Sequence, residues 1–500
     1  MTSKKTKEIT PIETEVTALV AKGMKALEAY ENFTQEQIDY IVAKASVAAL
    51  DQHGELALLA IKETQRGVFE DKATKNLFAC EYVVNDMRHL KTVGIISEND
   101  VTGITEIAEP VGVIAGVTPV TNPTSTTLFK CLIALKTRNP IIFSFHPSAQ
   151  QCSSASANVI YQAAVEAGAP EHCIQWIEHP SKEATADLMN HPDVATILAT
   201  GGNAMVKAAY SCGKPALGVG AGNVPAYIEK TFDLHQAVTD IVLSKAFDNG
   251  MICASEQAVI VDTEVSDEVR KLFVQYGAYF VSNEEKAMLE SFMFGVTCDG
   301  GGCENAYLNP NVVGQSAVWI ASKAGFTIPE STSILVVDVK KIGVEEPMTK
   351  EKLSPVLAYI TSESTAQGID LAKQMVEFNG LGHSAAIHTK SKEIADEFGK
   401  AVKAIRVIWN SPATFGGIGN VYNAFIPSLT LGCGSYGHNS VSNNVSAINL
   451  LNIKRIGRRN NNMQWFKIPS KIYFEENSIQ YLRQMKDVEK VFIVTDRAMV

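Results

Sequence analysis

The sequence lacks the features that define several protein classes. It has no Cys-x-x-Cys pair, no His-x-x-x-His spacing and no apolar run near the ~18–20 residues that a membrane span needs. Its nine cysteines are an odd, scattered set, which argues against a disulfide-rich secreted scaffold and fits a reducing compartment. The segment Met1–Glu8 is charged and lacks the apolar core that a signal peptide requires. We therefore expect a cytoplasmic protein.

Basic residues are also in the minority. The 44 Lys and Arg residues against 54 Asp and Glu residues give a net charge of −10. This balance argues against nucleic acid and anionic membranes as partners. Of the 500 residues, 46% are hydrophobic, and we find no repeats and no low-complexity segment. These values are typical of an ordinary globular protein with a large core, at roughly 100–200 residues per domain.

The hydrophobic pattern changes near residue 106. Before it, apolar residues recur at helical spacing, and Thr34 with Gln37 predicts a capping box, so we expect residues 1–100 to be mainly helical. After it, short β-rich runs alternate with helix-length segments, which indicates parallel α/β units. The expected strands are 111–117, 141–145, 174–177, 194–199, 226–228, 258–261, 334–339, 357–361 and 405–409.

The C-terminal region differs in charge. No acidic residue lies between Gly437 and Glu475, whereas the stretch 454–459 holds four basic residues. We interpret this stretch as the start of a polar interdomain linker rather than a basic binding surface. After it, 471–474 and 491–496 have the pattern of opening strands of another α/β unit. We expect that unit to be cut short, because no helix follows to cover its last strand.

One cysteine lies in a setting suited to chemistry. The segment 247–256, Phe-Asp-Asn-Gly-Met-Ile-Cys-Ala-Ser-Glu, places Cys253 shortly after Gly250 and just before an expected strand. A glycine turn can expose a thiol in the polar setting that a nucleophile needs. A lone cysteine is more often a buried packing residue, so both interpretations stay open at this point.

Three further segments bear on a binding site. Asn122 follows a β run on a tight turn, where its side-chain amide could donate a hydrogen bond to an oxyanion. The alternative is that the Asn-Pro pair only begins a turn. Residues 197–202, Ile-Leu-Ala-Thr-Gly-Gly, join a strand to a helix and either bind phosphate through backbone N–H groups or only turn the chain. The pattern Gly432-x-Gly434-x-x-Gly437 follows no clear strand and precedes no suitably spaced acidic residue, so we give it no dinucleotide role.

Together these motifs resemble a known family. Cys253 in Asp-Asn-Gly-Met-Ile-Cys-Ala-Ser-Glu-Gln, with 121–125, 199–202, 351–355 and 416–419, is similar to the CoA-acylating branch of the aldehyde dehydrogenase superfamily. The likeness is nearest to the acetaldehyde dehydrogenase half of the bifunctional aldehyde–alcohol dehydrogenases, and extends from about residue 15 to 455. Residues 467–500 resemble the start of their iron-dependent alcohol dehydrogenase half, whose iron ligands lie beyond this sequence.

The resemblance implies a fold and a division into domains. The fold would be α/β and aldehyde dehydrogenase-like, with a doubly wound cofactor domain, an α/β catalytic domain and a small oligomerisation arm. The expected parts are 1–243 for the N-terminal helices and NAD-binding domain, 244–430 for the catalytic domain, 431–455 for the return to the cofactor domain and the arm, 456–466 for a linker, and 467–500 for the start of the truncated alcohol dehydrogenase domain.

The resemblance also implies residue roles. Cys253 would be the nucleophile, Asn122 with the Cys253 backbone N–H would form the oxyanion hole, and His383 is either a proton-transfer group or a structural histidine. Glu351 would hold the nicotinamide ribose, and Asp496 would contact nucleotide in the second half if that half is present. The NAD site would be lined by Val117, Thr118, Pro119, Val120, Thr121, Asn122, Gly202, Gly220 and Leu431.

Two departures from the family pattern bear on the reaction. Hydrolytic relatives carry a glutamate that activates water, in a Glu-Leu-Gly-Gly-Lys-Ser-Pro stretch. The comparable stretch here, 219–225, is Val-Gly-Ala-Gly-Asn-Val-Pro and has no carboxylate. Water is then a poor nucleophile, and a thioester would persist until a thiol attacks it. Many relatives also place a lysine near the position of Ser144 to bind the adenosine ribose, and its absence weakens the case for NAD over NADP.

We therefore predict an NAD-dependent acetylating acetaldehyde dehydrogenase. It would interconvert acetaldehyde, CoA and NAD with acetyl-CoA and NADH in fermentation to ethanol, through a thioester on Cys253. We expect no metal site in this chain, iron only in the missing half, and a homo-oligomer that forms helical filaments in the full-length protein. The alternatives are a hydrolytic or semialdehyde dehydrogenase, which turnover without CoA would reveal, and a filament-forming assembly module without such activity.

Overall fold

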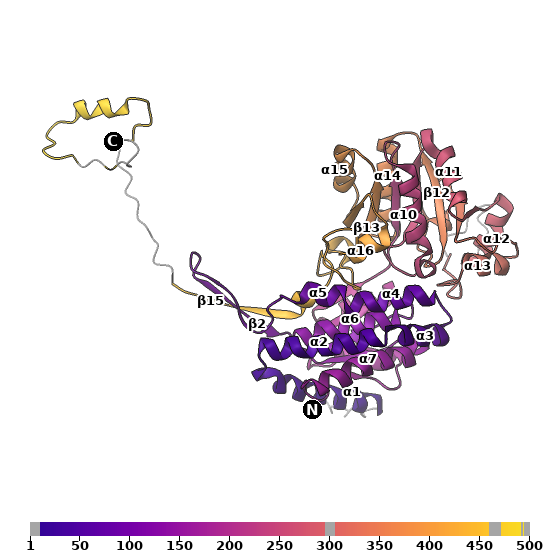
Figure 1. Cartoon of the computed structure of the whole chain (residues 1–500), viewed down its shortest axis with the longest axis horizontal. Helices are drawn as coiled ribbons and strands as arrows, with labels where there is room; N and C mark the ends of the chain where they lie inside the picture. Colours follow the sequence, from indigo (N-terminus) through magenta and orange to yellow (C-terminus); the bar gives the residue numbers. More distant parts are fainter. Residues whose placement is uncertain (1–10, 296–305, 460–471, 492–493, 495–500) are drawn as a thin grey trace, which may run out of the picture.

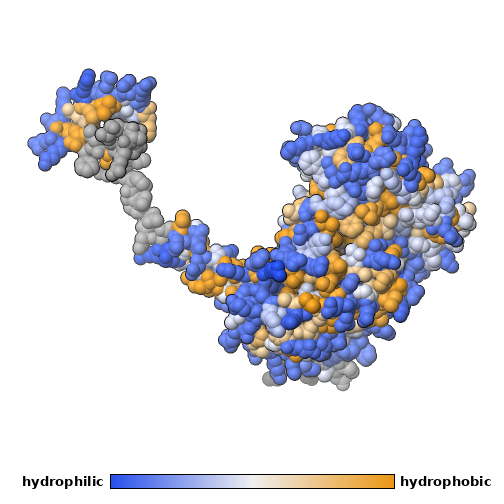
Figure 2. Space-filling model, in the orientation of Figure 1, coloured by the Kyte–Doolittle hydropathy of each residue, from blue (hydrophilic) through white to orange (hydrophobic). Residues whose placement is uncertain are grey.

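The computed structural model describes residues 11–295, 306–459, 472–491 and 494. Figure 1 shows two lobes, with helices α1–α7 in the lower lobe, helices α10–α16 in the upper lobe, and β2 and β15 projecting sideways as an arm. Figure 2 shows a mainly hydrophilic outer rim on the upper lobe and apolar residues gathered where the two lobes meet. Within the described residues, no helix combines the length and apolar character required to cross a membrane. The expected α/β class is confirmed.

The N-terminal region is helical, as predicted, but for fewer residues than expected. Thr34 caps the second helix, since its side chain accepts from the Gln37 backbone while the Gln37 side chain accepts from the Thr34 backbone. The helical region ends at Met87, and the first strand begins at Gly94. Its helices are α1 (Pro11–Ala29), α2 (Gln35–Asp51), α3 (His53–Thr64), α4 (Phe69–Cys80) and α5 (Tyr82–Met87).

A five-stranded parallel sheet forms the core of the lower lobe. Its spatial order is β5-β4-β3-β6-β7, so the chain reverses its direction of winding at β3 and β6. A doubly wound sheet leaves a crevice at the carboxyl ends of the strands at this switch point. Its strands are β3 (Val113–Val117), β4 (Ile141–Ser144), β5 (Ile174–Trp176), β6 (Val194–Thr200) and β7 (Ala216–Val219), and its helices are α6 (Pro123–Lys136), α7 (Gln150–Glu166), α8 (Lys182–Asn190) and α9 (Asn203–Ser211).

A seven-stranded parallel sheet forms the upper lobe, in the order β10-β11-β12-β9-β8-β13-β14. β8 already belongs to this sheet, so the change of sheet falls earlier in the chain than the expected boundary at residue 243. Its strands are β8 (Val224–Ile228), β9 (Glu256–Asp262), β10 (Ala278–Phe280), β11 (Ile334–Asp338), β12 (Val356–Ser362), β13 (Gly382–His388) and β14 (Ala404–Trp409). Its helices are α10 (Leu234–Ala246), α11 (Ser266–Gln275), α12 (Asn283–Phe294), α13 (Ala317–Ala324), α14 (Thr365–Asn379), α15 (Lys392–Ala401) and α16 (Ala413–Ile418).

The arm is an antiparallel sheet of β1 (Gly94–Asn99), β2 (Ile104–Pro110) and β15 (Leu451–Gly457). β15 includes part of the basic stretch, and its Arg455 pairs with Glu106 of β2 at 2.9 Å. The expectation that the linker starts at 456 is therefore wrong for residues 456–457, because cross-strand pairing with β2 extends to Gly457. The remainder of the expected linker, from residue 460 onward, lies outside the described residues.

The expected strands of the C-terminal unit are not seen in the described part of the tail. Ile472–Phe474 form no strand, so the prediction for 471–474 is wrong where the structure describes it. A 3-10 helix over Ser478–Gln484 is the regular element found there. Most of the expected strand 491–496, with Asp496, lies outside the described residues.

Candidate functional site

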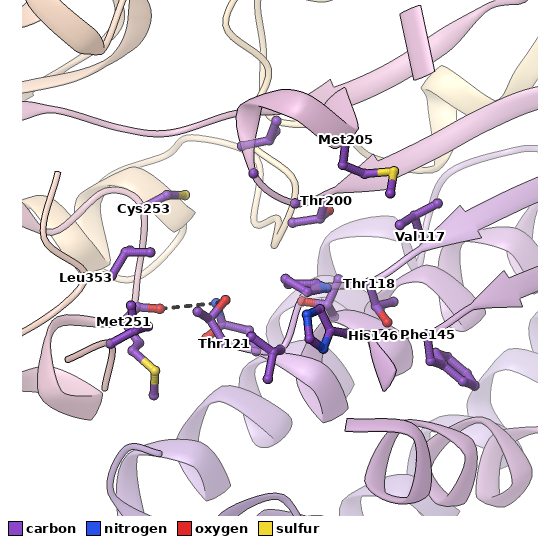
Figure 3. A pocket seen from close by; sticks show the side chains of 18 of the residues that line it. Val117, Thr118, Thr121, Phe145, His146, Thr200, Met205, Met251, Cys253 and Leu353 are labelled. Carbon is purple, nitrogen blue, oxygen red and sulfur yellow. Dashed lines mark hydrogen bonds between the residues drawn. The ribbon is translucent and has the colours of Figure 1, made fainter. Parts of the chain in front are cut away.

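A cavity of about 740 Å³ lies at the switch point of the five-stranded sheet and extends to the loop that carries Cys253. Its volume is within the range of small-molecule sites. Figure 3 shows side chains from both lobes around it, with Cys253 and Met251 on one side and Val117, Thr118 and Phe145 on the other. The lining includes these predicted site residues: Val117, Thr118, Pro119, Val120, Thr121, Asn122, Gly202, Gly220, Cys253, Glu351 and Leu431.

The loop that carries Cys253 has an unusual backbone. Asp248, Asn249 and Gly250 all have positive φ, of 48°, 52° and 72°, directly after helix α10. A side chain on Gly250 would meet the Ser354 carbonyl oxygen at 2.6 Å, so this turn requires glycine. The turn delivers Cys253 half-buried to the cavity wall just before β9. Burial raises the pKa of its thiol to about 12, with the Glu351 carboxylate as the next cause.

Asn122 connects the two walls of the cavity. It ends the loop after β3 and caps helix α6, whose first residue is Pro123. Its side-chain Nδ2 donates to the Met251 carbonyl oxygen at 3.1 Å, the hydrogen bond drawn in Figure 3. Lys75 Nζ donates to its Oδ1 at 2.7 Å. The amide NH₂ therefore faces the loop of Cys253, where an oxyanion of a substrate bound to the sulfur would form.

Glu351 is the one acidic residue among the described lining of the cavity. Its carboxylate accepts a hydrogen bond from the Gly222 backbone N–H at 2.9 Å. Burial raises the pKa of Glu351 to about 7, so the group titrates near neutral pH. The stretch 220–223 between β7 and β8, Gly-Ala-Gly-Asn, contains no acidic residue, so it adds no carboxylate to the cavity.

His383 lies behind the cavity rather than in its wall. It is fully buried in β13, its Nδ1 is 3.1 Å from Ser384 Oγ, and its Nε2 has no hydrogen-bond partner. Burial lowers the pKa of His383 well below its usual value, and the Arg406 cation adds to this shift. A Cβ on Gly222 would meet both the Cys253 carbonyl oxygen, at 2.0 Å, and His383 Nδ1, at 3.0 Å. His383 thus packs as a neutral imidazole next to the backbone of Cys253.

The residues of the crevice fit a dinucleotide. Gly202 is the N-cap residue of helix α9 and follows β6, and a Cβ built on it meets no atom within 4 Å, so the approach to its backbone is open. Helix N-termini with such access bind phosphate through their backbone N–H groups. Asp496, the other predicted nucleotide contact, lies outside the described residues.

Sequence reasoning missed two basic residues of the lining, Arg66 and Lys182. Arg66 follows helix α3 and donates to the carbonyl oxygens of Pro310 and Val313, which links the lower lobe to the upper lobe. No local motif marks such a contact, because the partners are far apart in sequence. Among the residues that the structure describes, no cluster of three or more His, Cys, Asp or Glu could hold a metal ion.

Comparison with known proteins agrees with this geometry. A family model described as aldehyde dehydrogenase family matches residues 5–286. The chain is 67% identical to the aldehyde-alcohol dehydrogenase of Streptococcus pneumoniae over 506 residues, which cover 100% of the chain and 57% of that protein. The chain therefore spans little more than half the length of this relative.

Two solved structures are similar over most of the chain. The acetylating aldehyde dehydrogenase from Geobacillus thermoglucosidasius is 42% identical, with a TM-score of 0.86, over 92% of this chain and 98% of that one. A propionaldehyde dehydrogenase from Rhodopseudomonas palustris, with bound CoA and an acylated cysteine, is 26% identical, with a TM-score of 0.78, over 89% of this chain and 97% of that one. The chain belongs to the aldehyde dehydrogenase family.

Proposed function

We propose that this chain is the CoA-acylating acetaldehyde dehydrogenase part of an aldehyde–alcohol dehydrogenase. It would interconvert acetaldehyde, CoA and NAD with acetyl-CoA and NADH, as a step of fermentation to ethanol. The observation that carries the proposal is that Cys253 and Asn122 meet at one cavity, which also opens onto the Gly202 end of helix α9. The similarity to relatives named as acetylating aldehyde dehydrogenases and to a CoA-bound, acylated one supports it.

The residues act in a defined order. The Cys253 sulfur forms a bond to the aldehyde carbon, and the negative charge that develops on the oxygen is stabilised by Asn122 Nδ2 and the Cys253 backbone N–H. When bound, NAD supplies the hydride acceptor that turns the adduct into a thioester. The CoA thiol then attacks the thioester carbon, and the Cys253 sulfur leaves with a proton.

Proton movement needs a base, because burial keeps Cys253 largely protonated at neutral pH. Glu351 lies in the cavity wall, whereas His383 lies behind it near the backbone of Cys253, and the two have different protonation behaviour. His383 is neutral and has a free Nε2, which suits it to proton transfer, as the family resemblance implies. Glu351 would hold the nicotinamide ribose through Oε2 while its Oε1 accepts from the Gly222 N–H.

The lining favours CoA over water as the second nucleophile. Hydrolysis needs a carboxylate to activate water, and Val219, at the corresponding position, is a buried apolar residue of β7. Glu351 is already bound to the Gly222 backbone, and its expected partner is the ribose. This is why we prefer thioester transfer to CoA over the hydrolytic alternative.

The finer biological setting belongs to the same proposal. We take the protein to be cytoplasmic and to use NAD rather than NADP, with no nucleic acid or membrane partner. The arm would join copies of the chain into a homo-oligomer, and into filaments in the full-length protein. Exposed apolar residues along the arm, Ile95 and Ile456 among them, support an association role.

The test follows the absorbance of NADH or NADPH formed from acetaldehyde with either NAD or NADP, in the presence and in the absence of CoA. We expect turnover that depends on CoA, acetyl-CoA as the product, and a preference for NAD. Equal turnover without CoA, with acetate as the product, would make the chain a hydrolytic dehydrogenase. No turnover under either condition would leave the assembly module as the better function.

A further inference from the structure

Helix α4 carries two lysines, Lys72 and Lys75, that are buried beside the cavity. Their side chains are only 3% exposed, and both donate to the same carboxylate oxygen of Asp248, at 3.1 Å and 2.5 Å. Burying charge is costly unless partners compensate for it. One carboxylate oxygen cannot by itself compensate for burying two lysine side chains. Each lysine therefore also makes a second contact.

The second contacts differ between the two lysines. Lys75 Nζ donates to Asn122 Oδ1 at 2.7 Å, whereas Lys72 Nζ donates to the backbone carbonyl of Thr121 at 3.1 Å. An ammonium group has donors only, so the Asn122 oxygen must face Lys75 and the NH₂ must face the opposite way. The opposite side is the loop of Cys253, where Asn122 Nδ2 meets the Met251 carbonyl oxygen.

Asp248 ties the same cluster to the catalytic loop. It lies within the positive-φ turn before Cys253, its Oδ1 accepts from the Val68 backbone N–H at 2.7 Å, and its own N–H donates to Asp71 at 2.7 Å. Helix α4 therefore holds both parts of the expected oxyanion hole. It holds the Asn122 side chain through Lys75, and the loop with the Cys253 N–H through Asp248.

We propose that Lys75 is a positioning residue of the reaction: it fixes the Asn122 amide with its NH₂ toward the loop of Cys253, and its charge polarises that amide. The inference rests on the proposed function, because it needs Asn122 to stabilise the oxyanion. Burial lowers the pKa of Lys75 to about 8, with the Asp248 carboxylate opposing the shift, so the group remains mainly cationic at neutral pH.

The chain offers a matched pair of variants. Lys75→Met and Lys72→Met each remove one buried cation from α4 and one hydrogen bond from Asp248, but only Lys75→Met releases Asn122. We expect Lys75→Met to lower the rate of NADH formation in a single turnover about 10- to 100-fold with little change in the KM for NAD, a smaller loss than removing an oxyanion donor itself. Lys72→Met should lower that rate less than about threefold, since the Asn122 contact remains.

A double-mutant cycle separates positioning from folding. In an Asn122→Ala background, Lys75→Met should cost less than about threefold, because the group that it positions is gone. Lys75→Gln, which keeps a donor for Asn122 Oδ1 but removes the charge, should recover part of the rate lost in Lys75→Met. Thermal unfolding and NADH fluorescence identify variants that fail to fold. If Lys75→Met fails to fold, the cycle with Asn122→Ala is measured with Lys75→Gln instead.

The outcomes distinguish the two proposals. An unmodified chain without CoA-dependent NADH formation overturns both the function and the positioning role. The positioning role alone is overturned if the chain is active and Asn122→Ala slows it, but Lys75→Met, or Lys75→Gln where it lowers the rate, slows both backgrounds by the same factor. An equal loss in Lys72→Met and Lys75→Met also overturns it, since the cause would then be the shared Asp248 contact.

Discussion

The two walls of the cavity are built from different chemistry. The wall from the five-stranded sheet presents mainly backbone and hydroxyl groups, including Thr118 and Thr121 after β3 and Gly202 before α9, together with the basic Lys182. The wall from the seven-stranded sheet presents Cys253 and Glu351, whose pKa values burial raises to about 12 and about 7. Binding without reaction suits the first wall, and bond making with proton transfer suits the second. Asn122 reaches across through its hydrogen bond to the Met251 carbonyl oxygen, and Arg66 does so through the carbonyl oxygens of Pro310 and Val313.

Loss of the nucleophile is the largest expected effect. Cys253→Ala should reduce CoA-dependent NADH formation by at least about 10³-fold, because no other side chain of the reactive wall can form the thioester. NADH binding, followed by fluorescence, should stay within about twofold, since the expected dinucleotide contacts are Glu351 and the residues of the other wall rather than the Cys253 sulfur. Activity close to that of the unmodified chain would assign the chemistry to another cysteine, with Cys212 or Cys433 as the next candidates.

Gly222→Ala, which adds one methyl group, should have the second largest effect on turnover. The added Cβ would lie 2.0 Å from the Cys253 carbonyl oxygen, so the catalytic loop must shift, at about 1–3 kcal/mol of overpacking. We expect Gly222→Ala to lower turnover about 100-fold and to lower the melting temperature, while NADH still binds. Full activity in this variant would show that the loop tolerates displacement and that Cys253 is not held as tightly as its packing implies.

The third effect is a shift in thiol reactivity with pH. Because the pKa of Cys253 is raised, its thiolate fraction should grow about tenfold per pH unit, and alkylation by iodoacetamide should rise between pH 7 and 10 without a plateau. The Glu351 carboxylate contributes to that shift once it ionises above its own pKa of about 7. Glu351→Gln should therefore react several-fold faster than the unmodified chain at pH 9, and equally fast at pH 6.

The same variant should turn over about tenfold more slowly, because it weakens the expected contact to the ribose. Faster alkylation together with slower turnover in Glu351→Gln would indicate an electrostatic effect on Cys253. Damage to the loop of Cys253 would instead lower both rates. The rate is measured by mass spectrometry of the Cys253 peptide, with Cys253→Ala as the blank. A plateau below pH 8 would contradict the raised pKa and would favour a thiolate stabilised by Arg406.

The sequence predicted most of the strands that are buried on both faces, but it missed β7 and β13, which are buried throughout. β3, β4 and β12 are short runs rich in branched apolar residues, which a covered parallel sheet requires. β13, with the sequence Gly-His-Ser-Ala-Ala-Ile-His, is equally buried but has no such run, so the pattern did not indicate it. The arm strands β1 and β15 are largely exposed and mix apolar with polar residues, and pairing with β2 rather than burial defines them.

The site shows the same division between local and tertiary information. Cys253, Asn122 and Gly202 stand in local motifs at the ends of strands or the start of a helix, and a single sequence indicates them. Lys75 contacts Asn122, 47 residues away, and Asp248, 173 residues away, and Arg66 contacts Val313, 247 residues away. Such contacts arise only when the lobes pack together. A buried lysine in an amphipathic helix gives no sign of them beforehand.

The smallest expected effect tests the binding wall by itself. Gly202→Ala adds a methyl group where the protein leaves open space, so its stability should fall by no more than about 1 kcal/mol, the cost of alanine in place of glycine at an N-cap. The same methyl group would occupy the approach to the backbone N–H groups of α9, and we expect NADH to bind about three- to tenfold more weakly with little change in single-turnover rate at saturation.

Gly399→Ala is the matched control for this variant, because a Cβ there also meets no atom within 4 Å but lies on α15, away from the cavity. It should leave NADH binding unchanged and raise stability by about 0.5–1 kcal/mol, as alanine favours a helix over glycine. Equal NADH affinity in Gly202→Ala and Gly399→Ala would remove the α9 terminus from the phosphate contact. A drop in the single-turnover rate in Gly202→Ala would show that the binding wall also orients the reacting groups, and that the two walls are less separate than their chemistry suggests.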